Sequence, residues 1–349
     1  MQLILDTKGL QLLKKRNSFH IVPEKGSSRT ISPKKLTSIA ITQSVMISSE
    51  AVVLAIKHEI PILFFDRIGK AQARLWSPYF GSIATLRRMQ VKFSESPQAT
   101  EWIIQLFELK TEGQIANLQR MIDSNSAQKE PIEKAIQSMK RQYKGMKKYK
   151  EETLKGAQRG IMGVEGGIAR SYWRQLGKSL PEAYAFEKRS RKPAKDNFNA
   201  ALNYLYGMLY SVVEGAIFAA GLDPHLGLLH SDEYNKPVLA FDLIEPFRPF
   251  VDRLLMEECF IHALEDSHFT RNQYGLFLNK SGKAYLIPLF NDHLRKEGKW
   301  LGRSTRFKNH IMYLAARLAQ RIRTFEVDAD FQIMDELAQD DQQAEDPQT

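Results

Sequence analysis

The segment GIMGVEGGIARSYWRQLGK, residues 160–178, carries a carboxylate where a helix would be expected to bury its surface. At helical spacing, Glu165 shares one stripe with apolar and aromatic residues, namely Ile168, Ala169, Tyr172 and Trp173. An ionised carboxylate on a buried stripe is costly unless a cation accompanies it. Glu165 is therefore a candidate for an ion pair or for a metal ligand.

A second group of polar residues lies in LGLLHSDEYNKPVLAFDLIEPFRPFVDRLL. His230 closes an apolar run, and Asp242 and Glu245 are three positions apart, so they point the same way on a helix. Pro246 and Pro249 predict that this helix has only just begun, because proline is tolerated in the first turn. The two carboxylates would then lie near the positive end of the helix dipole.

Carboxylates embedded in apolar sequence need a cation, and the sequence offers two kinds. Arg170, Arg174 or Arg248 could pair with them as plain counter-ions. A divalent metal could do the same and also perform chemistry. Oxygen ligands with one imidazole suit Mn²⁺ or Mg²⁺ better than a structural zinc. The residues alone leave both possibilities open.

A basic segment surrounds Glu165. Residues 140–178 hold eleven Lys or Arg against three Glu, with Tyr143, Tyr149, Tyr172 and Trp173 interleaved. Such cations can follow a phosphate backbone, and exposed aromatic rings can stack on unpaired bases. A solvated helical face would mix the two signs more evenly. The predicted DNA contacts are Lys147, Lys148, Lys150, Arg159, Arg170, Arg174 and Arg248.

The charge of the whole chain supports a polyanionic partner. The net charge is +10, but the residues from Thr324 onward hold nine acidic side chains and no Lys or Arg. The rest of the chain therefore has 50 basic against 31 acidic residues. The single cysteine, Cys259, excludes internal disulfides and cysteine-rich zinc modules and suits a reducing cytoplasm. The first apolar run is broken at Asp6, which argues against a secretory signal.

The elements that must position these residues change character along the chain. MQLILDTKGLQLLKKRNSFHIVP, KKLTSIAIT and IPILFFDRIGKAQARLWSP read as strands, with a turn at 66–70, and SSEAVVLAIKHE as a short helix capped by Ser48 or Ser49. From about Ile83 the periodicity is helical, apart from a predicted hairpin in YGLFLNKSGKAYLIPL that turns at 280–282. The apolar stretch 201–222 is interpreted as a buried central helix and not as a membrane span.

The sequence therefore predicts an α+β fold with a small N-terminal β-rich domain and a larger all-α C-terminal domain. The predicted parts are a β domain (1–85), a linker (86–95), a helical domain (96–326) and an acidic, disordered tail (327–349).

Three blocks, MGVEGGIARSYW, KDNFNAALNYLYGMLYSVVEGAIFAAGLDPHLGLLHS and LAFDLIEPFRPFVD, closely resemble the integrase of CRISPR adaptation, the first of the CRISPR-associated proteins. They occur in the family's order and spacing, and the resemblance covers essentially the whole chain. By position it implies that Glu165, His230 and Glu245 are the ligands of Mg²⁺ or Mn²⁺. Asp242 matches the acidic position that supports the site.

The resemblance implies a cytoplasmic enzyme that inserts short double-stranded DNA fragments beside a CRISPR repeat as new spacers, by metal-dependent transesterification. It also implies that the β domain (1–85) serves dimerisation in a homodimer and that the helical domain (96–326) is catalytic. A small ferredoxin-like partner protein is implied as well, with no role for a membrane. Two other interpretations stay open. One is a metal-dependent nuclease that cuts branched DNA, and the other is a non-enzymatic DNA-binding protein whose carboxylates only pair with arginines.

Overall fold

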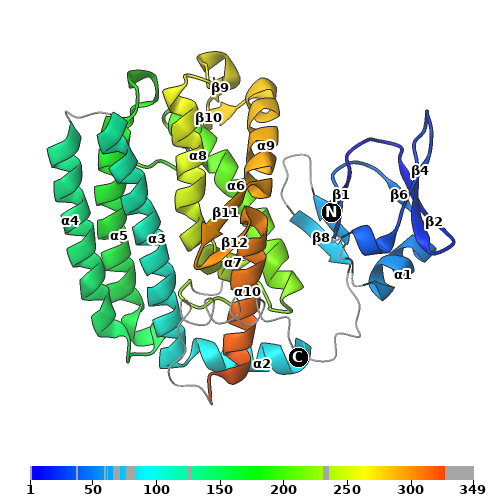
Figure 1. Cartoon of the computed structure of the whole chain (residues 1–349), viewed down its shortest axis with the longest axis horizontal. Helices are drawn as coiled ribbons and strands as arrows, with labels where there is room; N and C mark the ends of the chain where they lie inside the picture. The colour runs from blue at the N-terminus through cyan, green and yellow to red at the C-terminus, as the bar shows by residue number, and fades with distance from the viewer. Residues whose placement is uncertain are drawn as a thin grey trace, which may run out of the picture. The chain divides into compact units, whose positions relative to one another are not determined.

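The computed structural model describes residues 2–36, 38–58, 60, 62–65, 71–75, 83–124, 128–230 and 236–326. The chain divides into two compact units, Met1–Ala84 and Thr85–Thr349. The fold is α+β, as predicted, with the strands concentrated in the first unit and long helices in the second (Figure 1). The predicted turn at 66–70 and the acidic tail 327–349 lie outside the described residues.

The described residues of the N-terminal unit form two four-stranded sheets and one α-helix. One sheet has the order β1-β5-β7-β8, in which only the β7–β8 pair is antiparallel. The other has the order β4-β3-β2-β6. The bounds are β1 (Gln2–Leu5), β2 (Gln11–Lys15), β3 (Ser18–Val22), β4 (Arg29–Ile31), β5 (Ser38–Ile41), β6 (Met46–Ile47), α1 (Ser49–Lys57), β7 (Ile62–Phe65) and β8 (Ala71–Leu75).

Local sequence explains these elements. In β3, Phe19 and Ile21 are buried while their neighbours are only half-buried, which is the alternation of a strand with one face on the core. Ser48 caps α1, because its hydroxyl accepts a hydrogen bond from the amide of Ala51 at 3.2 Å. The predicted cap and the strand-rich character of this region are confirmed.

The second unit is mainly helical. α3, α4 and α5 lie side by side, and α6 packs against α7, α8 and α10 (Figure 1). Its helices are α2 (Ile83–Ser94), α3 (Pro97–Ser124), α4 (Lys129–Met146), α5 (Leu154–Ser179), α6 (Asn197–Ala219), α7 (Val238–Leu243), α8 (Arg248–Phe260), α9 (Lys280–Arg295) and α10 (Phe307–Thr324). The 3-10 turn η5 (Glu245–Phe247) joins α7 to α8.

The apolar stretch 201–222 is a core helix. Leu202, Leu205, Leu209 and Val213 of α6 are all fully buried within the larger hydrophobic core. Among the described helices, none is long and apolar enough to cross a membrane. The sequence-based preference for a buried helix over a membrane span is therefore confirmed.

Two sequence-based predictions for this unit are wrong. The hairpin consists of β9 (Phe269–Asn272) and β10 (Gly275–Leu278), so it turns earlier than predicted. Residues 280–282 instead begin α9, because the side chain of Asn279 accepts a hydrogen bond from the amide of Gly282 at 3.1 Å and caps the helix. The segment 86–95, predicted as a linker, lies almost entirely in α2.

The unit is also not all-α. A second hairpin, β11 (Glu297–Trp300) with β12 (Arg303–Arg306), was not predicted. Its two turn residues, Leu301 and Gly302, both have positive φ, at 50° and 82°, which is the backbone that a two-residue hairpin turn requires. The leucine at the first of these positions hides the usual turn signature, since leucine rarely adopts positive φ.

Candidate active site

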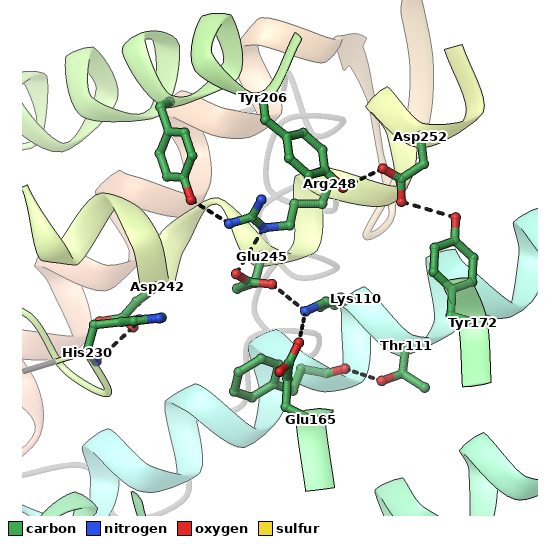
Figure 2. Close-up of polar contacts among 12 residues, drawn as sticks. Lys110, Thr111, Glu165, Tyr172, Tyr206, His230, Asp242, Glu245, Arg248 and Asp252 are labelled. Carbon is green, nitrogen blue, oxygen red and sulfur yellow. Dashed lines mark hydrogen bonds and ion pairs between the residues drawn. The ribbon is translucent and has the colours of Figure 1, made fainter. Parts of the chain in front are cut away.

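The four predicted active-site residues come from three elements and one connection, which meet near the start of α8 (Figure 2). Glu165 lies in the middle of α5 and Glu245 begins η5. Asp242 lies near the end of α7, and His230 lies in the connection that precedes this helix. The helix predicted to begin at both carboxylates is in fact interrupted between them, at Ile244, so Asp242 and Glu245 contact different partners.

Glu165 and Glu245 converge on one cation, the ammonium group of Lys110 from α3 (Figure 2). Nζ of Lys110 lies 2.5 Å from Oε1 of Glu165 and 2.6 Å from Oε2 of Glu245. The side chains of Lys110 and Glu245 are each only 9% exposed, whereas that of Glu165 is 30% exposed. Burial alone would lower the pKa of Lys110, but the charges of Glu245 and Glu165 outweigh it and hold the pKa above its ordinary value.

His230 is held by Asp242. Nδ1 of His230 lies 2.6 Å from Oδ1 of Asp242, whose other oxygen accepts hydrogen bonds from the amides of Leu228 and Leu229 at 2.8 and 3.2 Å. Burial opposes protonation of His230, yet the hydrogen bond and charge of Asp242, with that of Glu245, raise its pKa. Asp242 thus fixes the imidazole ring of His230 and the backbone of the connection that carries it. Because Nδ1 is bonded to Asp242, Nε2 is the ring nitrogen that remains available for another contact.

Arg248 anchors the second oxygen of Glu245. Its Nε donates to Oε1 of Glu245 at 2.9 Å, and one terminal nitrogen donates to the hydroxyl of Tyr210 at 2.5 Å. Its guanidinium also lies over the ring of Tyr206, 4.6 Å from the ring centre. Only 7% of Arg248 is exposed, so its prediction as a DNA contact is wrong, and its role as a counter-ion is the one seen. Burial raises the pKa of Glu245, but Arg248 and Lys110 outweigh this and lower it.

A further buried carboxylate, Asp252, lies near Arg248. Asp252 accepts hydrogen bonds from the hydroxyls of Tyr206 at 2.5 Å and Tyr172 at 3.1 Å, and Asn117 donates to the latter hydroxyl at 3.1 Å. Burial raises the pKa of Asp252 to about 6 despite these bonds. Tyr172 is therefore an internal residue of the stripe that also contains Ile168, and it does not offer its ring to DNA as predicted.

The basic residues divide into two groups. Lys147 and Lys150 are exposed but pair with Glu108 at 3.4 Å and Glu101 at 2.7 Å, and Lys148 lies over the ring of Tyr149. The exposed arginines of α5 recur at a spacing that places them on one face of this helix: Arg159, Arg170 and Arg174.

Lys110 is the residue that sequence reasoning missed. It follows Ile103 and Phe107 at the spacing of one helical stripe, and both of these are buried. A lone cation on an apolar stripe of α3 is the counterpart of the lone carboxylate on α5. This pattern could have indicated that Lys110 and Glu165 each need a charged partner, although it does not show which residue that partner is.

In this metal-free geometry the predicted ligands do not form a closed cluster. Over the described ranges, no group of three or more His, Cys, Asp or Glu side chains is arranged to hold a metal ion. Each carboxylate instead has a protein partner: Lys110 for Glu165, Arg248 and Lys110 for Glu245, and the imidazole of His230 for Asp242.

Comparisons with known proteins find relatives that match most of the chain. A family model described as CRISPR associated protein Cas1 matches residues 3–292. The CRISPR-associated endonuclease Cas1 1 of Archaeoglobus fulgidus is 27% identical over 324 residues, which span 89% of this chain and 93% of the relative.

Solved structures resemble the chain over nearly its full length. A casposase bound to integration product has a TM-score of 0.64 at 25% identity and covers 96% of this chain and 98% of its own. A chain of a Cas6-RT-Cas1–Cas2 complex has a TM-score of 0.70 at 19% identity and covers 93% of this chain and 35% of its own. Since the family model matches most of the sequence, the chain belongs to the Cas1 family of CRISPR-associated proteins.

Proposed function

We propose that in this CRISPR adaptation integrase, Glu165, His230 and Glu245 together hold a divalent cation, Mg²⁺ or Mn²⁺. The observation that carries the proposal is the convergence of Glu165 and Glu245, from separate elements, on a single cation position. Carboxylate oxygens with one imidazole nitrogen are the donors that these metals accept. Oε2 of Glu245 also fits, because it is buried and its partner is the cation Lys110 at 2.6 Å, whereas Oε1 is held by Arg248.

In the reaction, the 3′-hydroxyl of a DNA fragment attacks a phosphodiester at the edge of a CRISPR repeat, which forms a new phosphodiester bond, breaks the one attacked and releases the 3′-hydroxyl of the target strand. When bound, the metal would lower the pKa of the attacking hydroxyl and stabilise charge on the phosphoryl oxygens. The protein supplies positioning: Asp242 holds Nδ1 of His230, and Arg248 holds Oε1 of Glu245. No covalent enzyme intermediate is needed, so no Ser or Tyr nucleophile is assigned.

The partners of the reaction follow from charge and from the comparisons. The exposed arginines Arg159, Arg170 and Arg174 on α5, with Lys147, Lys148 and Lys150, would bind DNA phosphates. The likeness to a casposase bound to integration product supports a DNA substrate, and the likeness to a chain of the Cas6-RT-Cas1–Cas2 complex supports a partner protein. We propose that this partner is small and of ferredoxin-like fold. We further propose a homodimer built through the N-terminal unit and a cytoplasmic location.

A nuclease that cuts branched DNA is the second candidate, favoured by the name endonuclease of the curated relatives. It would use the same residues, so only the product separates the two. Integration joins the fragment to the target strand, whereas a nuclease leaves cut ends.

The test replaces Glu165, His230 and Glu245 singly by Ala in a strand-joining assay. Each variant should lose joining by at least a hundredfold yet bind DNA like the original chain, because binding comes from the basic face. EDTA should reproduce this loss in the original chain. Glu130→Ala, at an exposed pair with Lys134, is the control and should join normally. Joining in EDTA, or unfolding of Glu165→Ala, would refute the metal site.

A further inference from the structure

Lys110 occupies the position that the proposed metal needs. Its ammonium group bridges two carboxylates from different elements, at 2.5 Å from Glu165 and 2.6 Å from Glu245. The side chain is almost fully buried and comes from α3, which carries neither carboxylate. An ammonium group and a divalent ion bound to the same two oxygens would lie close together and repel each other.

We propose that Lys110 is an internal counter-ion of the metal site, which holds Glu165 and Glu245 together in the metal-free protein and is displaced when a divalent cation binds. The inference rests on the proposed function of these two carboxylates as ligands. It assigns to Lys110 the role of a positioning residue that sets metal affinity.

The two oxygens of Glu245 show why displacement is required. Oε1 accepts the hydrogen bond from Nε of Arg248 at 2.9 Å, so Oε2 is the oxygen left for another cation. Lys110 already lies 2.6 Å from that oxygen. A divalent ion bound to Oε2 would lie within a few ångströms of the ammonium group, and because Lys110 and Glu245 are buried their surroundings would screen the repulsion poorly.

The surroundings indicate which of the two cations leaves. Arg248 is held by Tyr210 and lies over the ring of Tyr206, so it is fixed in place. Lys110 has a flexible four-carbon stem, and the site is more open on the side of Glu165, whose side chain is 30% exposed. The lysine can therefore withdraw while Arg248 keeps Glu245 oriented.

A preformed but occupied site has two consequences. Without Lys110 the metal-free carboxylates would repel each other, so the lysine stabilises the empty site. With Lys110 present, a metal must compete for the carboxylates and binds less tightly than the donor set alone would allow.

The experiment measures Mn²⁺ binding by titration calorimetry and melting with and without Mn²⁺, in the full chain. Lys110→Met should melt lower than the original chain in EDTA, bind Mn²⁺ at least fivefold more tightly and gain a larger rise in Tm from Mn²⁺. Lys134→Met is the matched control, because Lys134 lies 2.5 Å from Glu130 but both side chains are about three-quarters exposed. It should change none of these values.

The outcomes separate this inference from the proposed function. If the original chain binds no Mn²⁺, or Glu165→Gln binds it equally well, the metal site is wrong and the role of Lys110 falls with it. If the original chain binds, Glu165→Gln does not, and Lys110→Met binds no more tightly, only the counter-ion role is overturned. Should Lys110→Met fail to fold, Lys110→Gln, which keeps N–H donors between the carboxylates, must show the same gain in affinity.

Discussion

Replacing Arg248 by Met should destabilise the protein without changing its charge contacts with DNA. Arg248 is 7% exposed and joins Glu245, Tyr210 and Tyr206 by an ion pair, a hydrogen bond and a cation–π contact. Methionine has a similar apolar length but no charge, so the substitution removes these three interactions and leaves most of the packing.

The magnitude follows from the contacts. Removing one partner of a buried ion pair costs about 3–5 kcal/mol because the other charge stays buried. Here Lys110 remains beside Glu245, which points to the lower end of that range. The lost hydrogen bond to Tyr210 and the contact with Tyr206 add about 1 kcal/mol each, while the desolvation of the guanidinium is no longer required. We expect a net loss of about 3 kcal/mol, or a fall in Tm of about 6–12 °C for a unit of this size.

The assay combines thermal unfolding in EDTA with DNA binding at several salt concentrations. Arg248→Met should melt lower but keep the salt dependence of DNA affinity. Arg170→Met, at an exposed position of α5, should melt normally and flatten the logarithmic salt dependence by about one unit. The reasoning is refuted if Arg248→Met melts like the original chain and loses salt dependence, since Arg248 would then contact phosphate.

Two further predictions concern acid stability and helix packing. Burial, with the charges of Arg253 and Lys296, lowers the pKa of His293 in the folded protein to about 4. Below the ordinary histidine pKa of about 6.5 the unfolded chain therefore binds a proton that the folded protein does not, and stability is lost as the pH falls toward 4. Between pH 7 and 4.5 the original chain should lose about 2–3 kcal/mol more than His293→Leu in denaturant unfolding, and equal losses would contradict this. In α5, Gly163→Ala should raise the free energy of unfolding by up to about 1 kcal/mol, because the added methyl group meets no atom within 4 Å. Gly177→Ala should lower it, since the methyl group would lie 2.1 Å from the carbonyl oxygen of Phe186, and a stable Gly177→Ala variant would show that this contact can relax.

Periodicity and local signals were sufficient for several features. The strand-rich first region, the cap at Ser48 and the buried helix α6 all follow from patterns within one segment. The stripe predicted around Glu165 holds in part: Ile168 and Tyr172 are buried, whereas Ala169, Trp173 and Glu165 itself are half-buried. These properties depend on residues within a few turns or pleats of each other, which is the range over which a sequence pattern carries information.

Local patterns were misleading where two local signals competed. The polar residues at 280–282 resemble a turn, but Asn279 uses its side chain to begin a helix there. At Leu301 the sequence lacks a residue that usually adopts positive φ, so the turn of this hairpin gives no clear sequence signal. Its register is set by pairing between β11 and β12.

The partners of the charged residues were decided only by the tertiary structure. The sequence marked Glu165 and Glu245 as carboxylates in need of a cation and offered several arginines, and the structure places Arg248 and the unpredicted Lys110 beside them. The residues close to Lys110 in the sequence do not indicate that Glu165 and Glu245 are its partners, because the contact exists only where α3 packs against α5 and η5. A buried charge is favourable only beside its counter-ion, so which charges can be buried depends on the packing of distant elements.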